Sequence, residues 1–242
     1  MKKFYMVLSL AGAMAAPNLF ASMSVTLLDN TSSYSYGDGG EFRAVGNAGL
    51  DSIINWNAYS TSTKGTIGAA DTSSWGYNSG LNTEQYFQTF CIQSTVYFAP
   101  GNSYSVVTSP TVSIGTAYLY SQFAAGTLSG YNYAYGASRE NTAGALQQAI
   151  WWLQGQTGGV KDGFVTAAET ALGNLTDAEI RAAANGAYGV VALDLGTRDQ
   201  PAQDQLAVVV PVPEPTTVIA GVLLLLPFGA SALRILRKTR TA

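Results

Sequence analysis

Two apolar runs, one at each end of this 242-residue chain, limit the folded domain to the residues between them. The first run, 4–16, follows Lys2 and Lys3 and is followed by the small residue Ala21. This order is typical of a secretory signal peptide cleaved after Ala21, and the alternative is a short membrane anchor. The second run, 218–233, would form a helix about 24 Å long, against a hydrocarbon layer of ~30 Å. We therefore expect a signal peptide at 1–21, an exported domain at 22–211, and a C-terminal segment at 212–242 with one transmembrane helix.

Short motifs flank the C-terminal apolar run. Pro213, Glu214 and Pro215 precede it, and it is followed by a basic tail of Arg234, Arg237, Lys238 and Arg240. The basic tail should stay cytoplasmic, which places the preceding domain across the membrane. A plain membrane anchor would explain these features. In this order, however, they resemble the PEP-CTERM sorting signal of Gram-negative bacteria. The resemblance implies recognition by an exosortase, transient anchoring in the inner membrane, and delivery to the cell envelope or the extracellular polysaccharide matrix.

The composition excludes several kinds of site. The chain has no histidine and one cysteine, which excludes a Ser-His-Asp triad, a Cys-His pair, a histidine-ligated zinc site and an intramolecular disulfide. Between residues 22 and 211, six basic residues stand against fourteen acidic ones, a net charge of −8. Because phosphate contacts need clustered Lys and Arg, we expect no nucleic-acid partner. The acidic residues do not recur at calcium-loop spacing, so we also expect no metal and no cofactor.

The residue pattern of the exported part predicts an α+β fold. Residues 31–79 are rich in Ser, Thr, Gly, Asn and Tyr, which favours short strands joined by turns. Further strands are expected at 23–28, 85–99, 103–114, 188–195 and 205–211. Helices are expected at 117–125, at 141–155 with Asn141 as N-cap and Gly155 after its end, and at 176–184 behind the capping box of Thr176 and Glu179. We therefore predict β-sandwich or barrel-like strands with a central helical insertion.

Two places in this pattern carry unusual residues. Cys91 lies in an apolar strand, and Gln147 and Gln148 lie in the middle of an apolar helix. A free cysteine is often only a small buried hydrophobe, and a helical glutamine often only faces water. Together, however, the segments 90–92 (FCI) and 146–151 (LQQAIW) resemble the two signature segments of bacterial surface thioester domains. Leu146 stands where that family usually has Thr. The resemblance covers about residues 85–153.

In that family, a cysteine sulfur and a glutamine side-chain carbonyl form an internal thioester, which an amine or hydroxyl of a target then attacks. The resemblance assigns these roles to Cys91 and Gln147. Forming the bond expels ammonia and requires near-attack geometry, which a rigid strand and a rigid helix can supply. Trp151 lies one turn after Gln147, where its indole could cover the bond and exclude water. Ordinary core packing is the alternative role for Trp151.

These observations favour an adhesin-like function. We expect an exported surface or matrix protein that a Cys91–Gln147 thioester attaches to a protein or polysaccharide. Since the group is consumed in one reaction, such a protein is not an enzyme. The alternatives are a non-reactive structural matrix protein with a free thiol, and a hydrolase with acidic catalysts. Tyrosines alternate at 34–36 and 131–135, which predicts either a sugar-stacking face or the cover of one side of a sheet.

Overall fold

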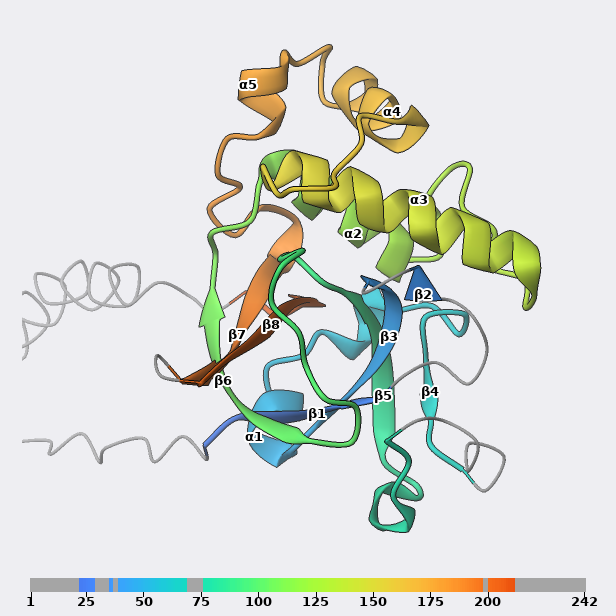
Figure 1. Cartoon of the computed structure of the whole chain (residues 1–242), viewed down its shortest axis with the longest axis vertical. Helices are drawn as coiled ribbons and strands as arrows, with labels where there is room; N and C mark the ends of the chain where they lie inside the picture. Colours follow the sequence, from blue (N-terminus) through green and yellow to red (C-terminus); the bar gives the residue numbers. More distant parts are fainter. Residues whose placement is uncertain (1–21, 29–34, 37–38, 69–75, 198–199, 212–242) are drawn as a thin grey trace, which may run out of the picture.

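An antiparallel sheet organises the part of the chain that the computed structural model describes, residues 22–28, 35–36, 39–68, 76–197 and 200–211 (Figure 1). The strands follow the order β4-β5-β3-β1-β6-β7-β8, and β2 pairs with β3 beside this path. Their bounds are β1 Ser24–Leu28, β2 Ser35–Tyr36, β3 Gly39–Gly46, β4 Lys64–Thr66, β5 Gln85–Phe90, β6 Ser103–Ser109, β7 Val190–Thr197 and β8 Gln200–Val208. Together with the helices, this sheet makes the fold α+β, as predicted.

The sheet path bends so that β5 and β8 also meet. Cys91, the residue after β5, forms an isolated antiparallel bridge with Gln205 of β8. Next to it, the Thr89 hydroxyl donates to the carbonyl oxygen of Leu206 at 2.7 Å and accepts from its backbone nitrogen at 3.0 Å. These contacts bring β8, at one end of the strand order, against β5, near the other end.

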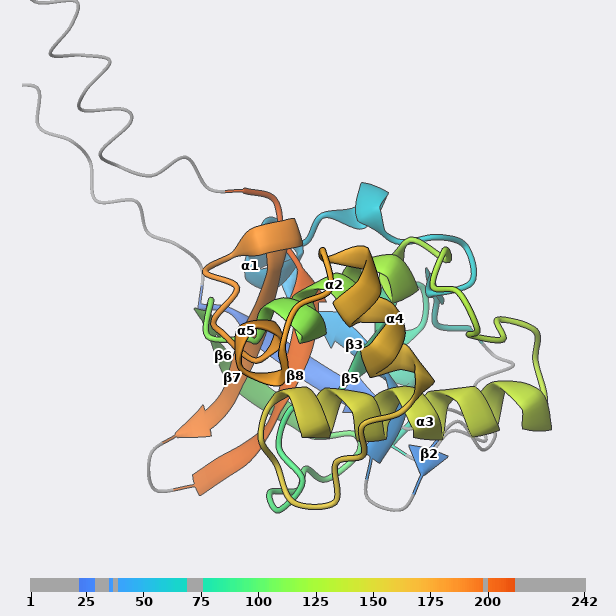
Figure 2. The same ribbon diagram turned by 90° about the horizontal axis from the view of Figure 1, so that it is seen from above.

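Most of the helices form an insertion between β6 and β7. They are α2 Ile114–Ala124, α3 Ala137–Leu153, α4 Gly163–Ala171 and α5 Asp177–Ile180, whereas the short α1 Ala48–Asp51 follows β3. Figure 1 shows α3 running across one end of the strands with α2 beneath it, and α4 and α5 beyond α3. Figure 2 shows the same layers from above. Helix α3 contacts β2 and β3, and α2 contacts β7 and β8.

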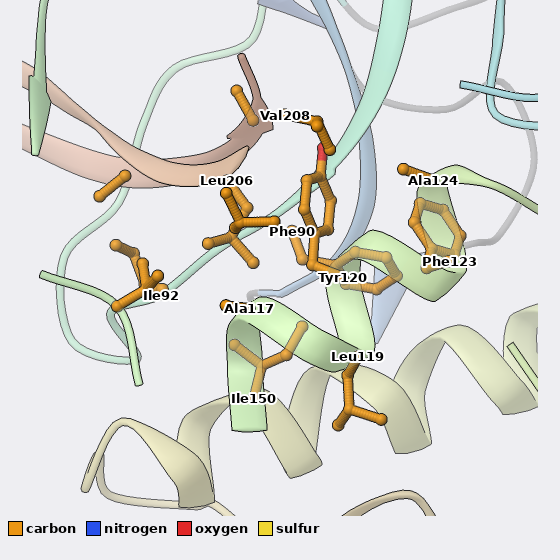
Figure 3. Packing of buried hydrophobic residues seen from close by; sticks show 14 of the residues in the cluster. Phe90, Ile92, Ala117, Leu119, Tyr120, Phe123, Ala124, Ile150, Leu206 and Val208 are labelled. Atoms are coloured by element: carbon orange, nitrogen blue, oxygen red, sulfur yellow. The ribbon is translucent and has the colours of Figure 1, made fainter. Parts of the chain in front are cut away.

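The core lies between α2 and the strands (Figure 3). Tyr120 and Phe123 of α2 are fully buried, and Phe123 meets Phe90 of β5 edge to face with ring centroids 4.9 Å apart. The Tyr120 hydroxyl donates to the carbonyl oxygen of Gln88 at 2.8 Å. Burying a side chain such as Phe90 contributes about 2–3 kcal/mol. This core therefore holds α2, and α3 packed on it, in a fixed position relative to the end of β5.

The helix starts differ from the sequence expectations. Helix α2 begins at Ile114, because the Ser113 side chain accepts from the backbone of Thr116 and caps it there. The prediction of Asn141 as N-cap of α3 is wrong, since α3 begins at Ala137 behind Gly136, whose φ of +124° turns the chain into the helix. Gly155 follows the end of α3 with φ +68°, as predicted.

The later helices are also only partly as expected. The predicted capping box of α5 is present, but the helix ends at Ile180 rather than at residue 184. Helix α4 was not predicted. Its N-cap Asp162 accepts from the backbone nitrogens of Phe164 and Val165 at 2.9 and 3.3 Å. Asp162, a residue type favoured at N-caps, was the available sequence signal for this helix.

The strands differ mainly in length. The predicted strand 85–99 is wrong beyond Phe90, because after the Cys91 bridge the chain leaves the sheet. The strand predicted at 103–114 ends at Ser109, where the helical insertion approaches. Strand β8 begins at Gln200, five residues earlier than expected, and β7 begins at Val190 and continues to Thr197.

The tyrosines at 131–135 do not cover a sheet. Tyr131 is buried and meets Phe123 edge to face at 5.1 Å, and Tyr133 stacks on the same ring at 6.0 Å. Tyr135 is 76% exposed. The segment lies between α2 and α3 and holds no strand, so its tyrosines help to join the helices to the core.

Several predicted segments lie outside the described residues: the signal peptide 1–21, the motif at Pro213 to Pro215, the apolar run 218–233 and the basic tail. Within the described ranges, no helix is both long enough and apolar enough to cross a membrane.

Candidate functional site

The structure places Cys91 at the junction of β5 and β8. β5 pairs with β3, in the register Glu41 to Phe90, and the bridge to Gln205 holds the next residue. The Cys91 side chain is fully buried and forms no disulfide. Its sulfur is therefore fixed in the protein interior by the two strands on either side of it.

Gln147 reaches this junction from α3. It is fully buried, whereas the neighbouring Gln148 is partly exposed. Its Nε2 donates to the carbonyl oxygen of Cys91 at 2.7 Å. Its Oε1 accepts from the backbone nitrogen of Cys91 at 3.2 Å and from that of Gly40 at 3.0 Å. Of the two glutamines singled out in the sequence, Gln147 is thus the one brought to Cys91, and its amide is held by three hydrogen bonds.

Two glycines make this close approach possible. A Cβ atom on Gly39 would lie 2.7 Å from Cγ of Gln147 and 2.7 Å from Cζ2 of Trp151. Gly40 has φ +118°, a conformation that side-chain-bearing residues rarely adopt. Its backbone N–H can therefore point at Gln147. The sequence marks these residues only as part of a turn signal, and it does not show that they contact α3.

Trp151 lies beside Gln147, as its helical spacing predicted. Its ring and the Gln147 side chain approach the same face of Gly39, and only 7% of Trp151 is exposed. Its indole Nε1 is buried and has no hydrogen-bond partner in the described part of the chain. Leu146 is fully buried in the apolar core, so the residue that replaces the usual Thr takes part in packing.

The sulfur itself contacts two glutamines that sequence reasoning missed. Cys91 Sγ donates to Gln203 Oε1 at 2.9 Å, and Gln205 Nε2 donates to Sγ at 3.6 Å. Both glutamines are buried, whereas Asp204 between them is partly exposed. Residues two apart on a strand share a face, so the alternation in β8 was a usable signal.

The environment of Cys91 favours the neutral thiol. Burial raises the pKa of the Cys91 thiol, and the hydrogen bond from Gln205 opposes this rise only in part. The sulfur's hydrogen-bond partners within the described ranges are neutral amides. Across the same ranges, no three His, Cys, Asp or Glu side chains gather in a way that could hold a metal ion.

An ion pair fixes α3 two turns before Gln147. Arg139 forms a buried salt bridge with Glu41 of β3, in which Nη2 and Nε contact the two carboxylate oxygens. Tyr131 donates to the same carboxylate at 2.6 Å, and Arg139 also donates to Gln88 Oε1 at 2.6 Å. Burial raises the pKa of Glu41, while Arg139 opposes this rise. Glu41 follows Gly40 directly, so α3 is held to β3 at two points about 12 Å apart along the helix.

Comparison with protein-family models, curated proteins and solved structures gave no match. The sequence motifs and the geometry of this site therefore indicate what the protein does.

Proposed function

We propose that this protein is an exported surface or matrix component whose Cys91 and Gln147 form an internal thioester, through which it becomes covalently attached to an amine- or hydroxyl-bearing partner. The observation that carries this proposal is the environment of the Gln147 carbonyl oxygen. Two backbone N–H groups, from Gly40 and Cys91, converge on it at 3.0 and 3.2 Å. Donors arranged in this way stabilise the negative charge that a carbonyl oxygen gains when a nucleophile attacks its carbon.

The proposed reaction balances without a cofactor. The Cys91 sulfur attacks the side-chain carbonyl carbon of Gln147, the S–C bond forms, and the C–N bond breaks. The thiol proton leaves with the nitrogen as ammonia. The nitrogen that departs is the one that Cys91 holds through its backbone carbonyl at 2.7 Å. Because the Cys91 backbone binds both the attacked carbonyl and the leaving nitrogen, the Gln147 amide is held in one orientation beside the residue that attacks it.

Attack by the partner reverses these roles. An amine or hydroxyl of a protein or polysaccharide bonds to the Gln147 carbonyl carbon, and the sulfur leaves as the thiol. The protein ends joined to its target, so it acts once and is a reactive binding protein, not an enzyme. Trp151 and Gly39 border the Gln147 side chain. We propose that the Trp151 indole limits hydrolysis by keeping water from the bond.

The intact mass of the purified full chain tests this proposal. The wild type should be lighter than its sequence mass by one ammonia, and Cys91→Ala and Gln147→Ala should both lack this deficit. Gln148→Ala is the matched control, since it removes the adjacent, partly exposed glutamine of the same helix and should keep the deficit. A wild type of full sequence mass would contradict the thioester.

One observation favours a second function, a non-reactive structural matrix protein with a free thiol. Burial stabilises the neutral thiol of Cys91 and so raises its pKa, and the hydrogen bond from the thiol to Gln203 also stabilises the neutral form. A full-mass protein that retains its fold would support this alternative.

The localisation of the protein is a separate proposal that rests on the sequences of the two chain ends. We propose export through a signal peptide at 1–21, a transmembrane helix within 212–242, and PEP-CTERM sorting by an exosortase to the envelope or extracellular matrix. Deleting residues 216–242 should release the protein unanchored into the periplasm or medium. Unchanged membrane fractionation would contradict the sorting proposal.

We also propose that the strands of the exported domain close in a barrel-like way. The bridge between Cys91 and Gln205 supports this closure.

A further inference from the structure

The sulfur of Cys91 has a set of contacts separate from those that hold Gln147. Gln203 Oε1 accepts its S–H at 2.9 Å, and Gln203 Nε2 donates to the carbonyl oxygen of Gln93 at 2.7 Å. The Gln203 side chain is therefore fixed at both ends of its amide. Only 1% of this residue is exposed, so water does not compete for these bonds.

Gln205 adds a hydrogen-bond donor to the sulfur. Its Nε2 lies 3.6 Å from Cys91 Sγ and 3.2 Å from the carbonyl oxygen of Gln203. Its Oε1 is buried and has no hydrogen-bond partner among the residues that the structure describes. Burying an unpaired amide oxygen is unfavourable, and an apolar residue of similar size would avoid this cost. Such a cost beside a candidate reactive group indicates that the amide has a role other than packing.

We propose that Gln203 and Gln205 are positioning residues for the Cys91 sulfur, a role that rests on the proposed thioester. Gln203 holds the S–H bond toward β8, so that a sulfur lone pair can attack the Gln147 carbonyl carbon. Gln205 donates an N–H to the sulfur and stabilises negative charge there, both when the sulfur attacks and when a partner later expels it. These two side chains thus act on the sulfur, while Gly40 and Cys91 act on the carbonyl oxygen.

Neither amide takes the proton, because a neutral amide is too weak a base. During bond formation, the Cys91 proton passes to the Gln147 nitrogen as the C–N bond breaks and the S–C bond forms. When an amine attacks the thioester, a new C–N bond forms, the C–S bond breaks, and a proton of the amine returns to the sulfur. The restored thiol then donates again to Gln203.

Gln203→Leu and Gln205→Leu, made in the full chain, test these roles. Thioester formation would be followed by the ammonia deficit in intact mass at set times after refolding. Each variant should form the bond at least about tenfold more slowly than the wild type, since misplacing a reacting group by about 1 Å can cost up to about a hundredfold. Val208→Ala is the control. Val208 is buried in β8 and makes no hydrogen bond to the sulfur, so this variant loses packing in the same strand but should form the thioester at the wild-type rate.

Gln205→Glu provides a readout that packing alone would not change. An ionised carboxylate has no donor for the sulfur, whereas its protonated form regains an O–H. Bond formation in folded Gln205→Glu should therefore slow as the pH rises through the pKa of the new carboxyl group, in contrast to the wild type. A wild-type pH profile in this variant would contradict the role of Gln205.

The outcomes separate this inference from the proposed function. A wild type that never shows the ammonia deficit would overturn the thioester, and the sulfur-positioning roles with it. A wild type that forms the bond while Gln203→Leu and Gln205→Leu form it equally fast would overturn the sulfur-positioning roles alone. Slower formation in both variants, with Val208→Ala unaffected, would support them.

Discussion

Helix α3 is held to β3 at two places that differ in chemistry. At Arg139, the contact is a buried ion pair in which Glu41 receives hydrogen bonds from Arg139 and Tyr131. At Gln147, the contact is a neutral amide bound to backbone groups of Gly40 and Cys91. The first is a charged anchor, and the second is a neutral cluster around a thiol.

The two places also differ in how fully their polar groups are paired. The Glu41 carboxylate is hydrogen-bonded through both oxygens. Around Cys91, Gln205 Oε1 and Trp151 Nε1 are buried and have no hydrogen-bond partner within the described ranges. Buried polar groups in native proteins are nearly always paired, so exceptions call for an explanation. We infer that the ion pair sets the position of α3, and that the neutral cluster is shaped by the chemistry proposed for Cys91 and Gln147.

Breaking the ion pair should have the largest effect on stability. Arg139→Met leaves the Glu41 carboxylate buried without its cation, which typically destabilises a protein by about 3–5 kcal/mol. Urea unfolding of the variant and the wild type would measure this loss. Lys161→Met is the control, because it removes an exposed cation paired with Asp177 and Glu169 and should change stability much less. Equal effects of the two substitutions would contradict the anchoring role of Arg139.

Filling the space beside Gln147 should have an intermediate effect on stability and abolish the reaction. The Cβ atom of Gly39→Ala would lie 2.7 Å from both Gln147 and Trp151, and overpacking of this kind costs about 1–3 kcal/mol. We expect a folded protein of full sequence mass. Gly163→Ala is the matched control, since its Cβ meets nothing within 4 Å and its backbone needs no positive φ. A full ammonia deficit in Gly39→Ala would show that Gln147 tolerates displacement.

The smallest expected effect is a pH dependence at Asp204, on β8 between the two glutamines. Burial raises its pKa to about 6, with a smaller contribution from Asp194. This exceeds the ~3.9 of an unfolded Asp, so the folded state binds the proton more tightly. The contribution of Asp204 to the free energy of unfolding is therefore greatest below about pH 4 and declines as the pH rises through about 6. Because the group is partly exposed, we expect a change of only about 1 kcal/mol.

Urea unfolding between pH 4 and pH 7 would measure this effect, with Asp204→Asn as the comparison. The variant keeps an acceptor for the Leu195 backbone nitrogen, which Asp204 binds at 2.9 Å, but it cannot ionise. The stability difference between the variant and the wild type should shift in favour of the variant as the pH rises. A difference that stays constant with pH would show that Asp204 titrates at its unfolded value.

The sequence allowed the α+β class, the central helices except α4, and the two key residues of the candidate site to be predicted. Cys91 and Gln147 were singled out because the segments around them resemble thioester-domain signatures, and such short motifs are local signals. The partners of these residues depend on strand pairing between distant segments. Gly40 reaches the Gln147 amide because β3 pairs with β5, and Gln205 meets Cys91 because β8 bends back to bridge it.

The charged anchor was missed for the same reason. Glu41 and Arg139 are far apart in the chain, and neither lies in a distinctive motif. The only local signal was an arginine at the start of an apolar helix. The structure shows that this arginine is buried. The strand errors have a local cause, because the β-forming residues after Cys91 favour a strand that the sheet does not continue.

Methylamine labelling followed by peptide mapping tests the central claim most directly. In folded wild type, methylamine should add to the Gln147 side chain as an N-methyl amide and release the Cys91 thiol, which then becomes alkylated once the protein is unfolded. Cys91→Ala should take up no label. Two results together would contradict the thioester and leave Cys91 as a buried free thiol. Gln147 would stay unlabelled in folded wild type, and Cys91 would be fully alkylated when protein that has not been treated with methylamine is unfolded.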